Sequence, residues 1–171
     1  MSLYSQKKDA LSLGFIITLL LVAYSPAIIG NFGFSDDYST YFVANMSHSD
    51  LIKWDVMSGR PLYAALRYFA QGFIESTSDF KIFRIVSVAS IISLGMFLYF
   101  FLRKSQFPGG LIAWCITPVL LCCLPPVALY GAWSTCFPYV TSIILAGLSY
   151  ANLNYNHNIS AYLRAPLSLL L

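Results

Sequence analysis

The feature that most limits what this chain can fold into is a set of three long segments without a single charged residue. Asp, Glu, Lys and Arg are absent from residues 10–35, 85–102 and 105–163. Each segment has at least about 18 residues, the length of an apolar helix that spans a membrane. The last is long enough for two helices of about 30 Å and a turn. Only 10% of the residues are charged, against about a quarter in soluble domains, so the sequence predicts a membrane protein.

The pattern along the chain predicts an all-α fold, a polytopic helical membrane protein that forms one transmembrane domain over residues 1–171. The predicted spans cover residues 10–30, 82–102, 111–130 and 137–151. The prolines Pro125 and Pro126 predict that the third span is kinked or broken close to them. A fifth apolar segment, 161–171, is too short to cross a bilayer. We therefore expect either a truncated chain or a last helix that lies shallow in the membrane.

The outer loop, residues 31–80, holds all but one of the seven acidic residues and is net negative, although the whole chain carries +3. No basic run exists that could follow a phosphate backbone, so we exclude nucleic acid as a partner. Lys7 and Lys8 precede the first span, and Arg103 and Lys104 precede the third. These positions favour a cytoplasmic N-terminus, which places loop 31–80 outside the cytoplasm.

The outer loop is patterned as short helices. Ser35 can cap a helix that begins with Asp36, a second helix follows Ser49 and ends at Gly59, and Pro61 fits the first turn of a third. In this third helix apolar side chains recur at spacings of 4, 3 and 4: Leu62, Leu66, Phe69 and Phe73. A helix with such a stripe lies on a membrane surface. We therefore expect juxtamembrane helices held against the lipid bilayer.

Asp36 and Asp37 follow the first span in an aromatic, partly apolar stretch. A carboxylate at a membrane interface can act as a general base, because partial loss of hydration raises the proton affinity of a carboxylate. Acids in the first turn of a helix also complement the helix dipole, and this structural role stays open for both residues. The local sequence alone therefore assigns no function to the pair.

Two arginines are candidates for binding an anion. Arg60 can present its planar guanidinium to a phosphate. Arg84 lies near the outer end of the second predicted span, where an ionisable side chain is a functional candidate by default. Both can equally be solvated or reach toward lipid headgroups, and that alternative also stays open.

The sequence shows no pattern of metal ligands. His48, Asp50 and Asp55 could contribute to a divalent metal site, but they lack a fixed ligand spacing. The four cysteines contain no Cys-x-x-Cys pair, and most lie in an apolar run, so we interpret them as packed thiols. We accordingly predict no metal and no other cofactor.

The outer loop resembles a known family. Residues 34–38 (FSDDY), followed by Trp54 and by residues 58–62 (SGRPL), are similar to the type II serotype-converting O-antigen glucosyltransferases. These enzymes belong to the GT-C class of integral-membrane glycosyltransferases. The resemblance extends over residues 11–103 and is strongest over residues 31–69. Members of the class have more spans than the four predicted here, so the chain resembles an N-terminal portion.

The resemblance implies an inverting transfer of a hexose, such as glucose, from a polyprenyl-phosphate donor to a lipid-linked glycan such as the O-antigen of lipopolysaccharide. It implies a bacterial inner membrane with loop 31–80 in the periplasm, and no metal. Asp36 or Asp37 would be the catalytic base, with a slight preference for Asp37. The residues expected to bind substrate are Arg60, Arg84, Tyr38 and Trp54.

The alternative function is that of a non-catalytic membrane protein, either a transporter fragment or an interaction subunit that uses the outer loop as a docking surface. Transporters usually carry charged or broken-helix features near the middle of the bilayer. The deep parts of the first, second and fourth predicted spans lack charge. Only the prolines of the third span fit that pattern.

Overall fold

The computed structural model describes residues 3–30, 32–33, 37–38, 48–71, 73 and 76–155. Their secondary structure is helical, with no strand among them, which confirms the all-α fold class. The elements follow one another as α1 (Leu3–Ile29), α3 (His48–Met57), α4 (Pro61–Gln71), η1 (Thr77–Asp79), α5 (Phe80–Lys104), α6 (Gly110–Cys122), α7 (Pro125–Ala132), η2 (Ser134–Cys136) and α8 (Phe137–Tyr155). The predicted apolar segment 161–171 lies outside the described residues.

Two of the described helices are long and apolar enough to cross a membrane, which indicates an integral membrane protein. They comprise residues Gln6–Ile29 of α1 and Phe80–Lys104, the whole of α5. Helices α6 and α7 bend by 61° at their junction and make a third span if the pair is counted as one. In α8 the apolar stretch Pro138–Gly147 is shorter. The structure thus contains two to three of the four predicted spans, because the last one is apolar over too few residues.

The break between α6 and α7 lies at the predicted prolines and has a simple cause. Proline has no backbone N–H, so Pro125 and Pro126 cannot donate to the carbonyls four residues before them, those of Leu121 and Cys122. The N–H of Leu124 donates to the Leu121 carbonyl at 3.3 Å. The hydroxyl of Tyr24, in α1, donates to the Cys122 carbonyl at 2.5 Å. The bend is therefore stabilised from a neighbouring helix.

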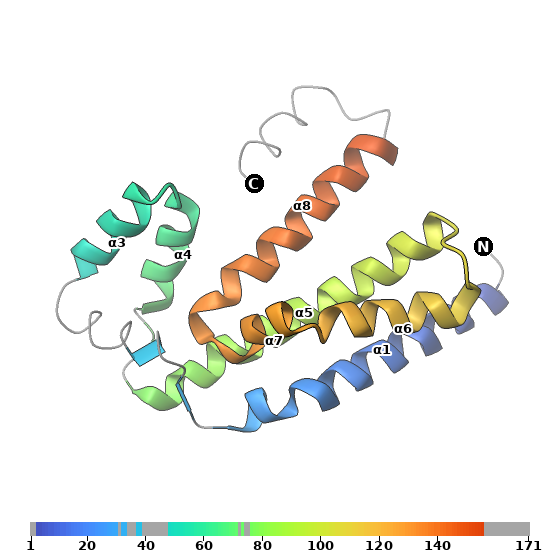
Figure 1. The fold of residues 1–171 in the computed structure, drawn as a ribbon, viewed down its shortest axis with the longest axis horizontal. Coiled ribbons are helices and arrows are strands. Elements are labelled where there is room, and N and C mark those ends of the chain that lie inside the picture. The colour runs from blue at the N-terminus through green and yellow to red at the C-terminus, as the bar shows by residue number, and fades with distance from the viewer. Residues whose placement is uncertain are drawn as a thin grey trace.

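Helices α1, α5 and α6 pack side by side, with the N-terminus at one end of this bundle (Figure 1). Their core contains Ile16 and Leu20 of α1 against α5. Gly95 permits the close approach of the two helices, since a Cβ there would lie 2.9 Å from Leu20 Cδ1. Near the N-terminal end, Asp9 of α1 pairs with Arg103 and accepts a hydrogen bond of 2.8 Å from the Tyr99 hydroxyl.

The end of α1, the beginning of α5, η2 and the beginning of α8 lie at the opposite end of the bundle, on the side of α3 and α4 (Figure 1). Helices α3 and α4 pack against each other as a hairpin. The predicted turn between them is confirmed, because Gly59 has a φ of 77° and α4 begins at Pro61. Of the predicted stripe, Phe69 on α4 and Phe73 just after α4 are exposed, whereas Leu66 is half-buried. The C-terminal end of the stripe therefore points out of the protein in this structure.

Candidate functional site

Asp37 is the one predicted catalytic residue that the structure describes, and it is fully buried. Its Oδ1 accepts a hydrogen bond of 2.6 Å from the hydroxyl of Ser134, and its Oδ2 accepts one of 3.4 Å from the Ser134 backbone N–H. Ser134 is the first residue of η2, the short turn that leads into α8. Asp37 thus joins the outer loop to the beginning of α8. Asp36 lies outside the described residues.

Arg84 is also fully buried, at the beginning of α5. Its Nε donates to the carbonyl of Ala27 at 3.0 Å, its Nη2 to that of Gly30 at 2.6 Å, and its Nη1 to that of Phe32. The last carbonyls of a helix have no partner within the helix, and the guanidinium supplies partners at the end of α1. The Phe32 ring lies 4.4 Å from the guanidinium carbon. Arg84 therefore holds the chain where it leaves α1.

Asp37 and Arg84 belong to one group of side chains. Asp37 and Tyr38 both act electrostatically on the Arg84 guanidinium. The Tyr38 hydroxyl accepts a hydrogen bond of 3.3 Å from the Gly33 N–H, and its ring meets that of Phe80 edge to face at 6.5 Å. The structure thus brings three of the predicted site residues together, where α1 ends and α5 begins.

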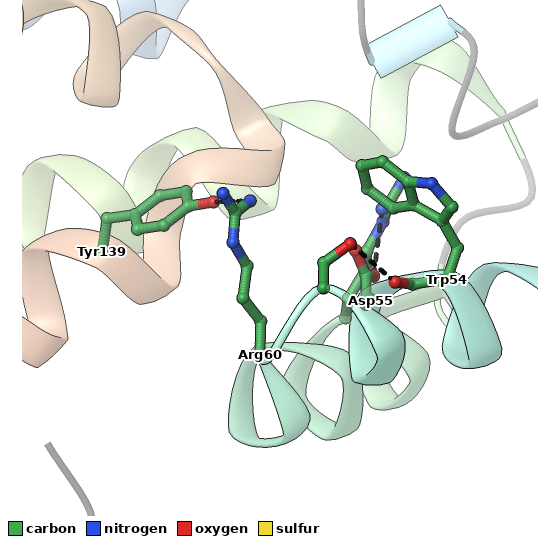
Figure 2. A network of polar contacts seen from close by, with 6 residues as sticks. Trp54, Asp55, Arg60 and Tyr139 are labelled. Atoms are coloured by element: carbon green, nitrogen blue, oxygen red, sulfur yellow. Dashed lines mark hydrogen bonds and ion pairs between the residues drawn. The ribbon is translucent and has the colours of Figure 1, made fainter.

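Arg60 lies in a different group, between the α3–α4 hairpin and α8. Its Nη1 donates to the hydroxyl of Tyr139 at 3.2 Å, an exposed contact shown in Figure 2. The Tyr139 ring stacks on Tyr63 of α4 at 5.3 Å and on Tyr130 of α7 at 5.7 Å. Arg60 and a stack of three tyrosines therefore join the hairpin to the bundle.

The hairpin contains a buried ion pair that sequence reasoning did not find. Asp55 of α3 is 1% exposed, and its Oδ2 lies 3.1 Å from Nη1 of Arg67 on α4. Trp54, the neighbour of Asp55, is 62% exposed. Its backbone carbonyl accepts a hydrogen bond of 2.8 Å from the Ser58 hydroxyl (Figure 2). The predicted substrate-binding residues therefore fall into two groups, Tyr38 with Arg84, and Arg60 in the hairpin with Trp54.

Ser134, Tyr63 and Tyr139 are site residues that the sequence did not single out, and Asp55 was considered only as a possible metal ligand. The sequence around each of them does not distinguish it from other polar residues. Its role depends on a partner far away along the chain, as in the pairing of Ser134 with Asp37. The nearest signal was the turn between the predicted spans 111–130 and 137–151, because that turn contains Ser134. It did not show which part of the outer loop would meet that turn.

Metal ligation finds no support among the described residues, since they contain no group of three or more His, Cys, Asp or Glu side chains that could hold a metal ion. Cys115, Cys122 and Cys136 are buried free thiols and Cys123 is an exposed one. The site is thus built from carboxylates, guanidinium groups, hydroxyls and aromatic rings. Such a set can accept protons and bind anions and hydroxyl groups.

Comparison with known proteins identifies no relative: neither a family model, nor a curated protein, nor a solved structure matches this chain.

Proposed function

We propose that this chain is an integral-membrane glycosyltransferase of the GT-C type, or the N-terminal portion of one. It transfers a hexose, preferably glucose, from a polyprenyl-phosphate donor to a lipid-linked glycan such as O-antigen. The observation that carries the proposal is the position of Asp37, a buried carboxylate at the outer end of apolar helices and within electrostatic reach of Arg84. A donor with a lipid tail and a charged head group requires a polar site next to apolar helices.

In the proposed topology α1, α5, the α6–α7 pair and α8 form four spans of a bacterial inner membrane. Lys7 and Lys8 lie near the beginning of α1, and Arg103 and Lys104 end α5. The ion pair of Arg103 with Asp9 brings these two helix ends together, which favours the cytoplasmic side for this end of the bundle. The acidic outer loop and Asp37 then face the periplasm. Although the apolar stretch of α8 is short, α8 can serve as the fourth span where the bilayer becomes thinner around the bundle.

In the proposed reaction, the acceptor hydroxyl oxygen attacks the anomeric carbon of the donor sugar with inversion. The bond between this carbon and the phosphate oxygen breaks, and polyprenyl phosphate leaves with the electron pair. Asp37 takes the proton of the acceptor hydroxyl, which replaces the Ser134 hydroxyl as its partner. The base is thereby shielded from water until the acceptor arrives.

The two arginines have different roles in this proposal. Arg60 is exposed, and a guanidinium in that position can neutralise the charge of the departing phosphate. Arg84 donates to the carbonyls of Ala27, Gly30 and Phe32 and is therefore a positioning residue, which fixes the chain just before Asp37. The exposed rings of Tyr38 and Trp54 are candidates for contact with a sugar.

The test is sugar transfer in membranes that contain the full chain, with polyprenyl-phosphate glucose labelled in the sugar as donor. Asp37→Asn keeps the size of the side chain, and we expect transfer to fall by about 100-fold or more, the usual contribution of a general base. Asp50→Asn is the matched control, because Asp50 is an exposed acid of the same outer loop. Equal amounts of inserted protein are confirmed by carbonate extraction. Undiminished transfer by Asp37→Asn would contradict the proposal.

One observation favours the alternative of a non-catalytic membrane protein with the outer loop as a docking surface. The hydrogen bonds from Ser134 to Asp37 and from Arg84 to the carbonyls of Ala27 and Gly30 tie the loop to the helix ends, as in a purely structural clamp. That alternative predicts no sugar transfer by the wild type and a loss of folding in Asp37→Asn. The same membranes therefore distinguish the two functions.

A further inference from the structure

Asp55 presents a buried carboxylate of which only one oxygen is used. The side chain is 2% exposed, and Oδ2 forms the ion pair with Arg67. Within the described part of the chain, Oδ1 is buried and has no hydrogen-bond partner. Burying a carboxylate oxygen without a donor is costly, and native proteins nearly always supply one. The unused oxygen therefore indicates a place for a donor that the described residues do not supply.

The surroundings of Asp55 define the chemistry of that donor. Asp55 and Arg60 both act electrostatically on Tyr139, and Asp55 and Arg67 both act on Tyr63. The rings of Tyr63 and Tyr139 are stacked at 5.3 Å with an angle of 27° between their planes. A carboxylate, two guanidinium groups and two aromatic rings thus converge where the α3–α4 hairpin meets α8. We call these five residues, Asp55, Arg60, Tyr63, Arg67 and Tyr139, the hairpin cluster.

Each part of the hairpin cluster matches one part of a sugar phosphate. A carboxylate accepts hydrogen bonds from hydroxyl groups, and Asp55 Oδ1 is in need of one. The faces of aromatic rings pack against the C–H face of a sugar ring as they do against other apolar groups. The guanidinium of Arg60 is exposed and suits a phosphate. A plain lipid phosphate would use Arg60 but would leave Oδ1 without a donor.

We propose that the hairpin cluster binds the sugar-phosphate head group of the lipid-linked donor, with a sugar hydroxyl on Asp55 and the phosphate on Arg60. This inference rests on the proposed function, because it names the part of the protein that recognises the donor sugar. Asp37 acts on the acceptor, whereas Asp55 distinguishes a sugar-bearing donor from a bare lipid phosphate. Arg67 is a positioning residue that fixes the Asp55 carboxylate.

The sugar phosphate enters the hairpin cluster between the α3–α4 hairpin and α8. The contact of Arg60 with Tyr139 is exposed, so a phosphate can replace the Tyr139 hydroxyl as partner of Arg60 (Figure 2). Asp55 Oδ1 itself is shielded from water. The hairpin therefore has to move away from Tyr139 as the sugar enters, and closes on it again when the hydroxyl reaches Asp55.

The experiment compares two probes on the full chain in lipid nanodiscs, farnesyl-phosphate glucose and farnesyl methyl phosphate, two phosphodiesters of equal charge of which only the first carries a sugar. Affinity is measured by titration with each probe and by the rise in thermal stability that binding produces. We expect the wild type to bind the sugar-bearing probe at least about ten-fold more tightly, the effect of a hydrogen bond to a charged group. Arg60→Gln should weaken both probes by a similar factor.

The decisive variant is Asp55→Leu with Arg67→Met, which removes both partners of the ion pair and leaves no unpaired charge of that pair buried. Its preference for the sugar-bearing probe should fall to about one, while its affinity for farnesyl methyl phosphate remains. The matched control is Asp50→Leu with Lys53→Met, which removes an exposed ion pair of 3.7 Å on the same helix and should keep the preference.

The outcomes separate this inference from the function on which it rests. If the wild type binds both probes equally, or the Asp55→Leu/Arg67→Met variant keeps the preference, the role of Asp55 is refuted and the proposed function is untouched. If the wild type binds neither probe, the proposed function and this inference both fail.

Discussion

The hydroxyl of Ser134 donates a hydrogen bond of 2.6 Å to Asp37, a residue 97 positions earlier in the chain. The same carboxylate accepts a second hydrogen bond from the Ser134 backbone N–H. One acidic side chain of the outer loop thereby fixes the turn from which α8 begins. Because α8 carries Tyr139, this contact also determines where the α3–α4 hairpin meets the bundle.

Removal of the Ser134 hydroxyl should destabilise the protein. In Ser134→Ala the buried Asp37 Oδ1 loses a hydrogen bond to a charged group, and we expect a loss of about 1–3 kcal/mol in the free energy of unfolding. The measurement is unfolding by SDS in mixed micelles, followed by circular dichroism. Ser93→Ala is the control, because the exposed hydrogen bond of Ser93 goes to Ala89 in its own helix, and it should cost less than about 0.5 kcal/mol. Equal stabilities of the two variants would contradict the structural role of Ser134.

Arg84 should not tolerate replacement by lysine. A lysine keeps the charge but cannot present the planar set of donors that reaches three carbonyls at the end of α1. We expect Arg84→Lys to lose about 3 kcal/mol in the same unfolding measurement, since two or more buried hydrogen bonds disappear. The exposed Arg60→Lys serves as control and should change stability by less than about 0.5 kcal/mol. A tolerated Arg84→Lys would show that the carbonyls find other donors.

Tyr24 should be coupled energetically to Pro126. In Tyr24→Phe the buried Cys122 carbonyl loses its donor, at a cost of about 1–3 kcal/mol. Pro126→Ala restores an N–H four residues after Cys122, so Tyr24→Phe should cost less in that background. The measurement is a double-mutant cycle of unfolding free energies. Additive effects of the two substitutions would disprove that Tyr24 compensates for the proline.

Stability should depend on the proton of Tyr63 in alkaline solution. Burial raises the pKa of Tyr63 from its ordinary value of 10.0 to about 12. Between pH 10 and pH 12 the unfolded chain releases this proton first, so the contribution of Tyr63 is fully present below pH 10 and is lost as the pH rises to 12. The stability of the wild type relative to Tyr63→Phe should therefore fall across this window. A constant difference between the two proteins would refute the prediction.

The outer surface of the hairpin should lie in the membrane interface. Trp54, Tyr68, Phe69 and Phe73 are exposed on or just after α3 and α4, and the two helices belong to a chain with long apolar spans. Aromatic rings of this kind are enriched at the level of the lipid headgroups. In a variant with Trp114→Phe and Trp133→Phe, brominated lipids should quench Trp54, most strongly with bromine near the headgroup. An unquenched Trp54 would place the hairpin away from the bilayer.

Much of the fold follows from local properties of the sequence. The charge-free segments became α1, α5, the α6–α7 pair and the apolar part of α8, and the break at Pro125 is where it was expected. The hairpin turn at Gly59 and the start of α4 at Pro61 were also predicted. The fourth predicted span was not confirmed, because the apolar stretch of α8, Pro138–Gly147, is too short for a membrane-spanning helix. The first helix of the outer loop lies largely outside the described residues.

The candidate site was only partly predictable. Asp37, Tyr38 and Arg84 were named from the sequence and lie together, whereas Arg60 belongs to the hairpin cluster. The roles of Asp55, Ser134 and Tyr139 were not foreseen. Each of these residues acts through a partner on another element, and nothing in its own segment distinguishes it from an ordinary polar side chain.

The sequence by itself determined that this protein is helical and apolar, where its helices break and which segment contains most of its acidic residues. Helix length, the missing N–H of proline and the flexibility of glycine act within a few residues, so they can be read along the chain. Only the tertiary structure decided that Asp37 meets Ser134, that Arg84 holds the end of α1, and that Asp55 pairs with Arg67. Buried polar groups require partners, and the packing of the helices determines which partners come within reach.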